Sequence, residues 1–186
     1  MPKIIDEDEV FAAVIKILVT RGYDRATVQE LAAAAKIHEA TLFRKYGSKA
    51  GLIERAVERE FSKAPLSQVS YTGNLEGDLH AILEAYMATY QEYGEIIPMI
   101  LLEIPRYPEL RNVLETPWAN IRGLVDIIER YQSQGLLREE PPLMSVNAFL
   151  APVLLSNMVA RANSAIPVPS IDLHDYVEAF LAGRRR

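Results

Sequence analysis

Hydrophobic side chains recur every three or four residues along almost the whole chain, and no segment alternates strictly between apolar and polar positions. This spacing is typical of amphipathic helices, whereas strands with one buried face alternate. Acidic residues at 6–9 favour a helix N-terminus, and Gly22 favours a helix end. The pattern predicts a first helix over about 6–21, with an apolar face formed by Val10, Phe11, Val14, Ile15 and Leu18.

Two short helices are predicted next, on either side of a tight turn. Thr27 and Glu30 form the capping-box pattern T-x-x-E, which predicts a second helix over about 28–35. A break at 36–37 precedes a third helix over about 39–45. A long helix followed by two short ones around a tight turn is the layout of a helix-turn-helix DNA-binding motif.

The rest of the chain also has a helical pattern. Ser48 is placed to cap a fourth helix, and a polar loop at about 64–73 follows it. Further helices are predicted after Asn74, over about 96–104, over 108–134 with a bend or split at Pro117, over 143–162 and over 171–182. The sequence therefore predicts an all-α fold, with an N-terminal three-helix helix-turn-helix domain (1–63, including the start of a linking helix) and a second helical domain (64–186).

The composition excludes several kinds of chemistry. The chain has 186 residues and no cysteine, which excludes disulfides, thiol nucleophiles and thiolate metal sites. The three histidines are scattered along the sequence and do not predict a metal site. No nucleophile elbow, P-loop or zinc-protease motif is present. We therefore expect neither an enzyme nor a protein with a cofactor.

The net charge of −5 taken alone argues against nucleic acid, but its distribution changes that view. Residues 1–63 carry 11 Lys and Arg against 10 Asp and Glu, whereas residues 64–186 carry 9 against 15. Within 36–49 there are four cations and one acidic residue, with hydroxyl and aromatic side chains among them. Cations, hydroxyls and helix N-termini suit contacts to phosphate, so this segment is the predicted DNA-binding surface.

One segment resembles a membrane span. Residues 141–160 carry no charge, but they include three prolines and several Ser and Asn residues. A spanning helix needs about 20 mostly apolar residues, so a helix buried on most of its circumference is the preferred interpretation. The N-terminal residues lack the apolar run of a signal peptide. We expect a cytoplasmic protein without membrane contact.

The segment LAAAAKIHEATLFRKYGSKAGL (31–52) resembles the helix-turn-helix signature of TetR-type transcriptional regulators. The departures from that signature are Lys36 in place of a turn glycine and His38 in place of serine. Phe43 keeps the aromatic ring of the usual tyrosine but lacks its hydroxyl. The positions that match are Ala32, Ala35, Ile37, Thr41, Leu42, Phe43, Tyr46, Ser48, Lys49 and Leu52. The resemblance implies a homodimeric regulator, typically a repressor released from a palindromic operator in double-stranded DNA by a small-molecule effector. It also implies that the second domain binds the effector and forms the dimer.

The resemblance assigns DNA contacts residue by residue. The implied phosphate anchors are Thr27, Thr41, Lys45 and Lys49. The candidate base-reading residues are His38, Glu39, Ala40 and Arg44. Phe43 and Tyr46 would set the third helix against the domain, and Lys36 and Ser48 complete the surface. Two alternatives stay open, because Tyr46 could be a core residue and His38 could only cap the helix. The competing function is a helical interaction module whose basic hairpin does not bind DNA specifically.

The effector site is less well defined by the sequence. Candidate cavity-lining residues are His80, Tyr86, Met87, Tyr90, Met99, Glu103, Trp118 and Tyr131. Each of them could equally be a core residue, because aromatic and Met residues at helical spacing usually pack inside. Since few charges fall in this apolar part of the chain, we expect a neutral or lipophilic effector.

The dimer interface is predicted in the last two helices. A stripe at three- and four-residue spacing consists of Val146, Phe149, Leu150, Val153, Leu154 and Met158, and the last helix adds Val177, Phe180 and Leu181. A helix that is apolar nearly all round needs cover on two sides, and a second subunit would supply one of them. The alternative is that this helix lies at the centre of a monomer.

Overall fold

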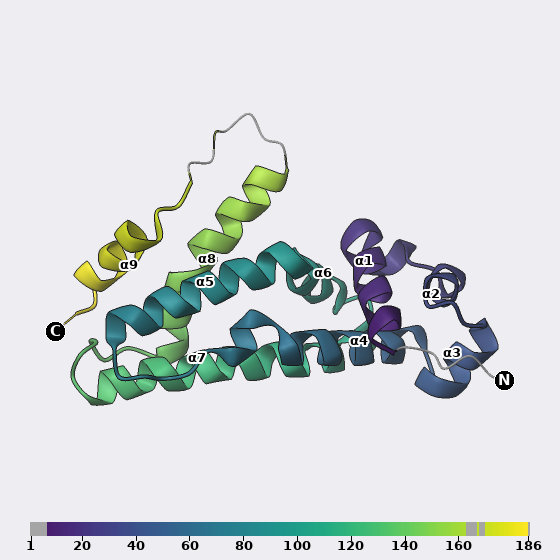
Figure 1. The fold of residues 1–186 in the computed structure, drawn as a ribbon, viewed down its shortest axis with the longest axis horizontal. Helices are drawn as coiled ribbons and strands as arrows, with labels where there is room; N and C mark the ends of the chain where they lie inside the picture. Colours follow the sequence, from purple (N-terminus) through teal and green to yellow (C-terminus); the bar gives the residue numbers. More distant parts are fainter. Residues whose placement is uncertain (1–6, 163–166, 168–169, 186) are drawn as a thin grey trace.

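The computed structural model describes residues 7–162, 167 and 170–185, and these residues form nine α-helices and two short 3-10 helices. The molecule is elongated (Figure 1): α2 and α3 lie at one end, and α9 lies with the C-terminal residues at the other. The only β-type pairing within the described ranges is an isolated bridge between Leu137 and Arg185. The predicted all-α fold is confirmed.

The N-terminal helices follow the predicted pattern and their caps. They are α1 (Glu7–Arg25), α2 (Val28–Ala34), α3 (Glu39–Tyr46) and α4 (Lys49–Lys63). The capping box is complete, because Thr27 Oγ1 accepts from the Glu30 N–H at 3.2 Å and Glu30 Oε2 accepts from the Thr27 N–H at 3.1 Å. Ser48 Oγ accepts from the Gly51 N–H at 3.0 Å and so caps α4. The α-helical angles of α1 stop at Gly22, where φ is 75°.

The turn between α2 and α3 has left-handed backbone at Lys36, where φ is 54°. The Lys36 N–H donates to the carbonyl of Ala33, and the Ile37 N–H donates to that of Ala32. These two bonds form a Schellman motif, whose left-handed position is normally a glycine. The lysine at this position is therefore strained relative to glycine.

Replacing Lys36 with glycine is expected to raise the free energy of unfolding by roughly 1 kcal/mol, because the Cβ penalty of the left-handed conformation disappears. The substitution also removes the exposed Lys36–Glu9 ion pair, at 3.5 Å, but an exposed pair contributes little stability, so its loss offsets little of this gain. Denaturant titration of the free protein measures the change. A clear loss of stability would contradict the strain argument, and Lys16→Gly, in the interior of α1, is the control that should destabilise.

The second part of the chain contains the remaining elements. They are η1 (Pro65–Gln68), α5 (Leu75–Tyr93), α6 (Ile96–Glu103), η2 (Pro108–Leu114), α7 (Glu115–Ser133), α8 (Pro142–Arg161) and α9 (Leu173–Ala182). The break predicted at Pro117 lies earlier, between η2 and α7, and Pro117 occupies the first turn of α7. Proline is tolerated there because the first turn has no intrahelical partner for its N–H group.

Two hydrophobic cores hold the molecule together. The first joins α1–α4, and it continues into α6 and η2 through Ile96, Ile100, Leu110 and Val113. The second joins α5, α7, α8 and α9 around Phe149. The helices of the helix-turn-helix therefore share a core with α6 and η2, which belong to the second domain in sequence.

Candidate nucleic-acid interface and internal cavity

Nearly all of α3 faces solvent. Among its residues, all of which the structure describes, only Leu42 is buried. Thr41 and Tyr46 are half-buried. The exposed side chains are those of His38, Glu39, Ala40, Phe43, Arg44 and Lys45. A helix with one buried residue and a mixed polar and cationic outer face can lie in the major groove of DNA.

The two aromatic residues of α3 have different environments. Phe43 is 47% exposed on α3. Tyr46 packs edge-on against Phe11 of α1, with ring centroids 6.0 Å apart. Tyr46 therefore helps to fix α3 on α1, while Phe43 remains available to the DNA surface.

The three N-cap residues of this surface differ in whether their side chains make a capping hydrogen bond. His38 occupies the N-cap position of α3, but its side chain makes no capping hydrogen bond and is exposed. The imidazole is therefore not used as a cap. Thr27 and Ser48 do cap α2 and α4, as predicted. Their hydroxyls accept from the helix backbone and retain a proton that can be donated to a phosphate.

Acidic residues at the start of α1 contact the cations of the interface. Lys45 Nζ lies 2.6 Å from a Glu7 oxygen, and Lys36 Nζ lies 3.5 Å from a Glu9 oxygen. The hydrogen bond that Lys45 donates to the Glu7 carboxylate raises the pKa of the Lys45 ammonium, which stays charged. From the sequence, Glu7 and Glu9 were predicted to lie at a helix N-terminus, but not beside the cations of the DNA-binding surface. Any phosphate that binds Lys45 competes with Glu7.

Lys49 is placed differently from the expectation. Its ammonium donates to the carbonyl of Tyr23 and lies 4.1 Å from the centre of the Tyr23 ring. Burial lowers the pKa of Lys49. In the structure Lys49 therefore takes part in the packing of α4 against the end of α1.

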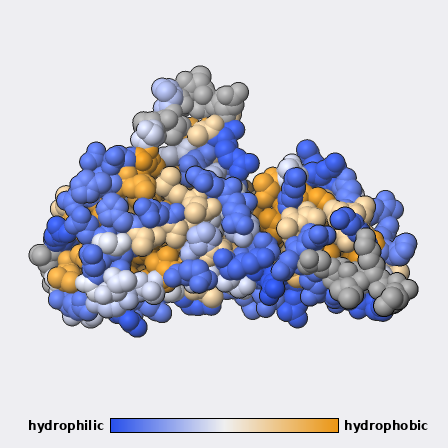
Figure 2. Space-filling model, in the orientation of Figure 1, coloured by the Kyte–Doolittle hydropathy of each residue, from blue (hydrophilic) through white to orange (hydrophobic). Residues whose placement is uncertain are grey.

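A cavity of about 230 Å³ lies between α4, α5, α6, α7 and α8. Among the described residues, none of those that line it carries a formal charge. Its walls include Phe61, Tyr86, Thr89, Tyr90, Tyr93, Ile97, Leu101, Trp118, Asn120, Ile121, Asn147, Leu150 and Leu154. Leu101 and Trp118 are each 40% exposed at its edge. Figure 2 shows hydrophobic patches that interrupt the hydrophilic surface of the molecule.

Most polar groups of the cavity wall already have partners. The Tyr90 hydroxyl donates to Glu95 at 2.6 Å, that of Tyr93 to the Glu60 carbonyl at 3.3 Å, and the Asn120 amide to the Phe61 carbonyl at 3.0 Å. Tyr86 has no hydrogen bond among those described, and burial raises the pKa of its hydroxyl. The cavity therefore offers mostly apolar contact, and the Tyr86 hydroxyl is one of its hydrogen-bond donors without a described partner.

The predicted cavity residues divide into three groups. Tyr86, Tyr90 and Trp118 line the cavity as predicted. Met99 lies at a second cavity, of about 140 Å³, next to α1. The expectation was wrong for His80, Met87, Glu103 and Tyr131, which line neither space. Tyr131 is a fully buried core residue whose hydroxyl donates to Asp78.

The predicted dimer stripe faces the wrong side of α8. Val146, Phe149, Leu150 and Val153 are buried in the protomer's own core, as are Val177, Phe180 and Leu181 of α9. Leu154 lines the cavity, and Met158 is half-buried. An opposite face of α8, which we call the outer face, is exposed and consists of Met144, Ala148, Pro152 and Leu155. In the protomer α8 is thus buried on one face and not on most of its circumference.

The helix α8 is also the one described helix that is long and apolar enough to cross a membrane. This finding rests on length and composition only, and its buried face packs in the second core.

Three comparisons place the chain among known proteins. The family model for bacterial regulatory proteins of the tetR family matches residues 11–56. An HTH-type transcriptional regulator of Mycobacterium tuberculosis is 32% identical over 156 residues, covering 84% of this chain and 75% of the relative. The DNA-binding transcriptional repressor TetR of Mycobacteroides abscessus is 29% identical over 175 residues, covering 94% and 79%. The structure of AibR in complex with isovaleryl coenzyme A and operator DNA has the same fold, with a TM-score of 0.63, 19% identity and coverage of 94% and 95%.

Proposed function

Because this chain belongs to the TetR family of helix-turn-helix transcriptional regulators, we propose that it is a dimeric repressor that a small-molecule effector releases from a palindromic operator. As a member of that family it is a DNA-binding regulator and not an enzyme. The observation that carries the proposal is the outer side of α3, where polar, cationic and aromatic side chains face solvent on one short helix. We expect it to act in the cytoplasm, where DNA is accessible.

The side chains of the interface suit two kinds of contact. Arg44, His38 and Glu39 can reach base edges, with the Arg44 guanidinium matched to guanine and the Glu39 carboxylate to cytosine. Thr27, Thr41 and Lys45 offer hydroxyls and a cation, which are groups that suit contacts to phosphate. The contacts to phosphate give affinity that depends on salt, and the contacts to bases give sequence preference.

The DNA-binding proposal predicts opposite effects for the two members of one ion pair. Lys45→Ala should weaken binding to specific and random duplexes alike, and it should reduce the log–log salt slope by about 1 for each subunit bound. Glu7→Gln should instead strengthen binding a few-fold, because phosphate no longer competes with the carboxylate for Lys45. Titration of labelled duplex at several salt concentrations measures both.

A matched control is available in Lys63, which is exposed at the other end of α4 and pairs with Glu60. Lys63→Ala should leave the salt slope unchanged. Wild-type binding without salt dependence, or a Lys45 variant that alters sequence preference alone, would contradict the proposed phosphate contact.

The cavity is the proposed effector site. Its uncharged, largely apolar wall supports a neutral or lipophilic small molecule. Phe61 on α4 and Ile97 on α6 both line it, while Ile96 and Ile100 of α6 pack in the core of the helix-turn-helix. A ligand that moves α4 or α6 would change the position of α3 through this shared core. AibR, whose structure contains isovaleryl coenzyme A and operator DNA, is a protein of this fold that binds both a small molecule and an operator.

Filling the cavity should remove ligand binding without touching the DNA surface. Ile121 lies on α7 and lines the cavity, so Ile121→Trp should lower the affinity for the neutral naphthalene dye prodan at least about tenfold. Dye fluorescence during titration measures this. Arg122→Trp adds the same ring on the exposed side of α7 and should bind prodan like the wild type. Equal affinities for all three proteins would exclude this cavity as the site.

The proposed dimer forms through the outer face of α8. Its exposed side chains are apolar or small, which allows a second copy of the helix to approach closely. The same residues would meet their own copies across a two-fold axis. Two copies of α3 could then contact successive turns of the DNA, as a palindrome requires.

A further inference from the structure

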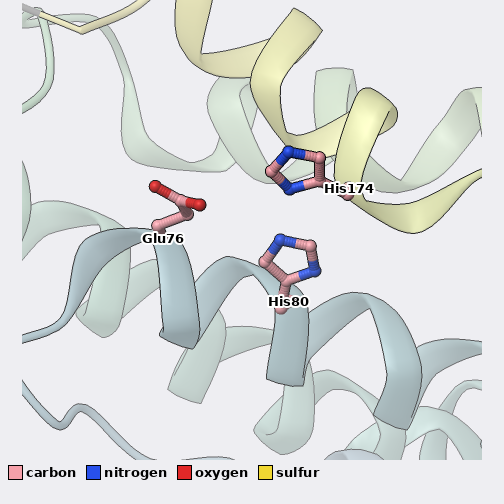
Figure 3. Close-up of side chains that lie close together, drawn as sticks. All are labelled: Glu76, His80 and His174. Carbon is pink, nitrogen blue, oxygen red and sulfur yellow. The ribbon is translucent and has the colours of Figure 1, made fainter.

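Three side chains that bind metals well lie together at the end of the molecule opposite α3. Glu76 and His80 come from α5 and His174 from α9 (Figure 3). One donor atom of each lies within 4.8 Å of a donor atom of the other two. The sequence did not predict a metal site, because the histidines are far apart in the chain. The packing of α9 on α5 brings two of them together.

The local structure favours this grouping. Glu76 and His80 are four residues apart on α5, so their side chains project from the same face of the helix. His174 lies in the first turn of α9, and its ring is nearly parallel to that of His80, with 9° between the planes and 5.9 Å between centroids. His174 is exposed, and the other two side chains are half-buried. An ion can therefore enter from solvent.

We propose that Glu76, His80 and His174 form a binding site for a divalent transition-metal ion of the zinc class. Two imidazoles and one carboxylate suit Zn²⁺, Ni²⁺ or Cu²⁺, whereas Mg²⁺ and Ca²⁺ prefer oxygen ligands only. Bonds of about 2.0–2.1 Å at tetrahedral angles place ligand atoms about 3.3 Å apart, so rotamer changes of less than about 2 Å close the site. Three protein ligands leave the fourth position of zinc to water.

Arg185 is the neighbour that competes with the metal. Its guanidinium Nη2 lies 3.6 Å from Glu76 Oε2, and both side chains are about half exposed. An exposed ion pair of this length is weak, so a metal ion can displace it. Removing the guanidinium should leave zinc affinity unchanged or increase it.

A bound ion would fasten α9 to α5. In the protomer, α9 is held by Val177, Phe180 and Leu181 in the second core and by the Tyr176 hydroxyl, which donates to the Phe149 carbonyl at 2.6 Å. The metal adds a link at the first turn of α9, beyond these contacts. It would therefore stabilise the end of the molecule that contains α8 and α9, independently of whether α3 binds DNA.

Calorimetric titration of the full-length wild type with zinc chloride, in a buffer without chelators, tests the site. We expect one ion per chain with a dissociation constant below about 10 µM. His80→Gln and His174→Gln should each weaken binding about 100-fold or more, and Glu76→Gln at least about tenfold. Arg185→Ala should bind at least as tightly as the wild type, and His38→Gln, which removes the histidine outside the cluster, should keep the wild-type zinc affinity.

Thermal unfolding gives a second readout. Zinc at about 100 times its dissociation constant should raise the wild-type melting temperature by roughly 5–10 °C, whereas His174→Gln should show no rise and magnesium should have no effect. His174 is exposed, so this variant should fold normally and melt like the metal-free wild type. A dissociation constant for zinc above about 10 µM, or equal zinc affinity for the wild type and both cluster histidine variants, would overturn the proposal. So would a zinc ion shared between two chains, seen as half an ion per chain.

Discussion

Leu155→Glu should convert the dimer to monomers and lower the affinity for a palindromic duplex at least about 100-fold, because joining two binding modules commonly raises affinity by 10²–10⁴. Leu155 is 62% exposed in the protomer, on the outer face of α8. In the proposed dimer it is covered by the partner, so the substitution buries two carboxylates, one from each subunit. An unpaired buried charge is strongly destabilising.

Sedimentation at micromolar concentration and duplex titration measure the two effects. Leu102→Glu is the matched control, because Leu102 is 79% exposed on α6, away from the outer face. This control should remain dimeric and keep its affinity. Dimers of Leu155→Glu, or a wild type that is monomeric at this concentration, would contradict the proposed interface.

Arg44→Ala should cause the second large effect, a loss of operator affinity of roughly 30- to 10⁴-fold. A bidentate contact from arginine to guanine contributes about 1–3 kcal/mol, and the dimer makes it twice. Arg44 lies on the exposed side of α3. Sequence preference should relax at one position of each half-site, because the residue that distinguishes that base pair is gone.

Competition between operator variants measures both the loss and the relaxed position. Arg122→Ala removes an exposed arginine from α7 and should change neither. If Arg44→Ala weakened all duplexes equally, Arg44 would be a phosphate contact and the proposed base contact would be wrong.

The local features of the fold were predictable from the sequence because short-range interactions determine them. The capping box at Thr27 and Glu30, the cap at Ser48 and the cap at Asn74 each involve residues three apart, and all three are present. The left-handed backbone at Lys36 was indicated only by the resemblance, because this lysine stands where the TetR-type signature has a turn glycine. Helix boundaries therefore agree within a few residues.

Features that depend on packing between distant helices were not predictable in this way. An apolar pattern on most sides of α8 does not say which side faces the core, so Val146 and Phe149 were assigned to the dimer interface although they are core residues. Phe61 of α4 and Asn147 of α8 line the same cavity, and the hydrophobic periodicity of the sequence does not predict that these residues lie close together. The ammonium of Lys49 is held by Tyr23, which belongs to another helix.

The most direct test of the central claim is selection of bound duplexes from a random DNA pool, followed by measurement of the mass of the selected complex. Dimeric reading by two copies of α3 predicts enrichment of one palindrome, with half-sites about one helical turn or a multiple of it apart, bound by an even number of chains. Enrichment of no sequence, or of a single half-site bound by one chain, would contradict it.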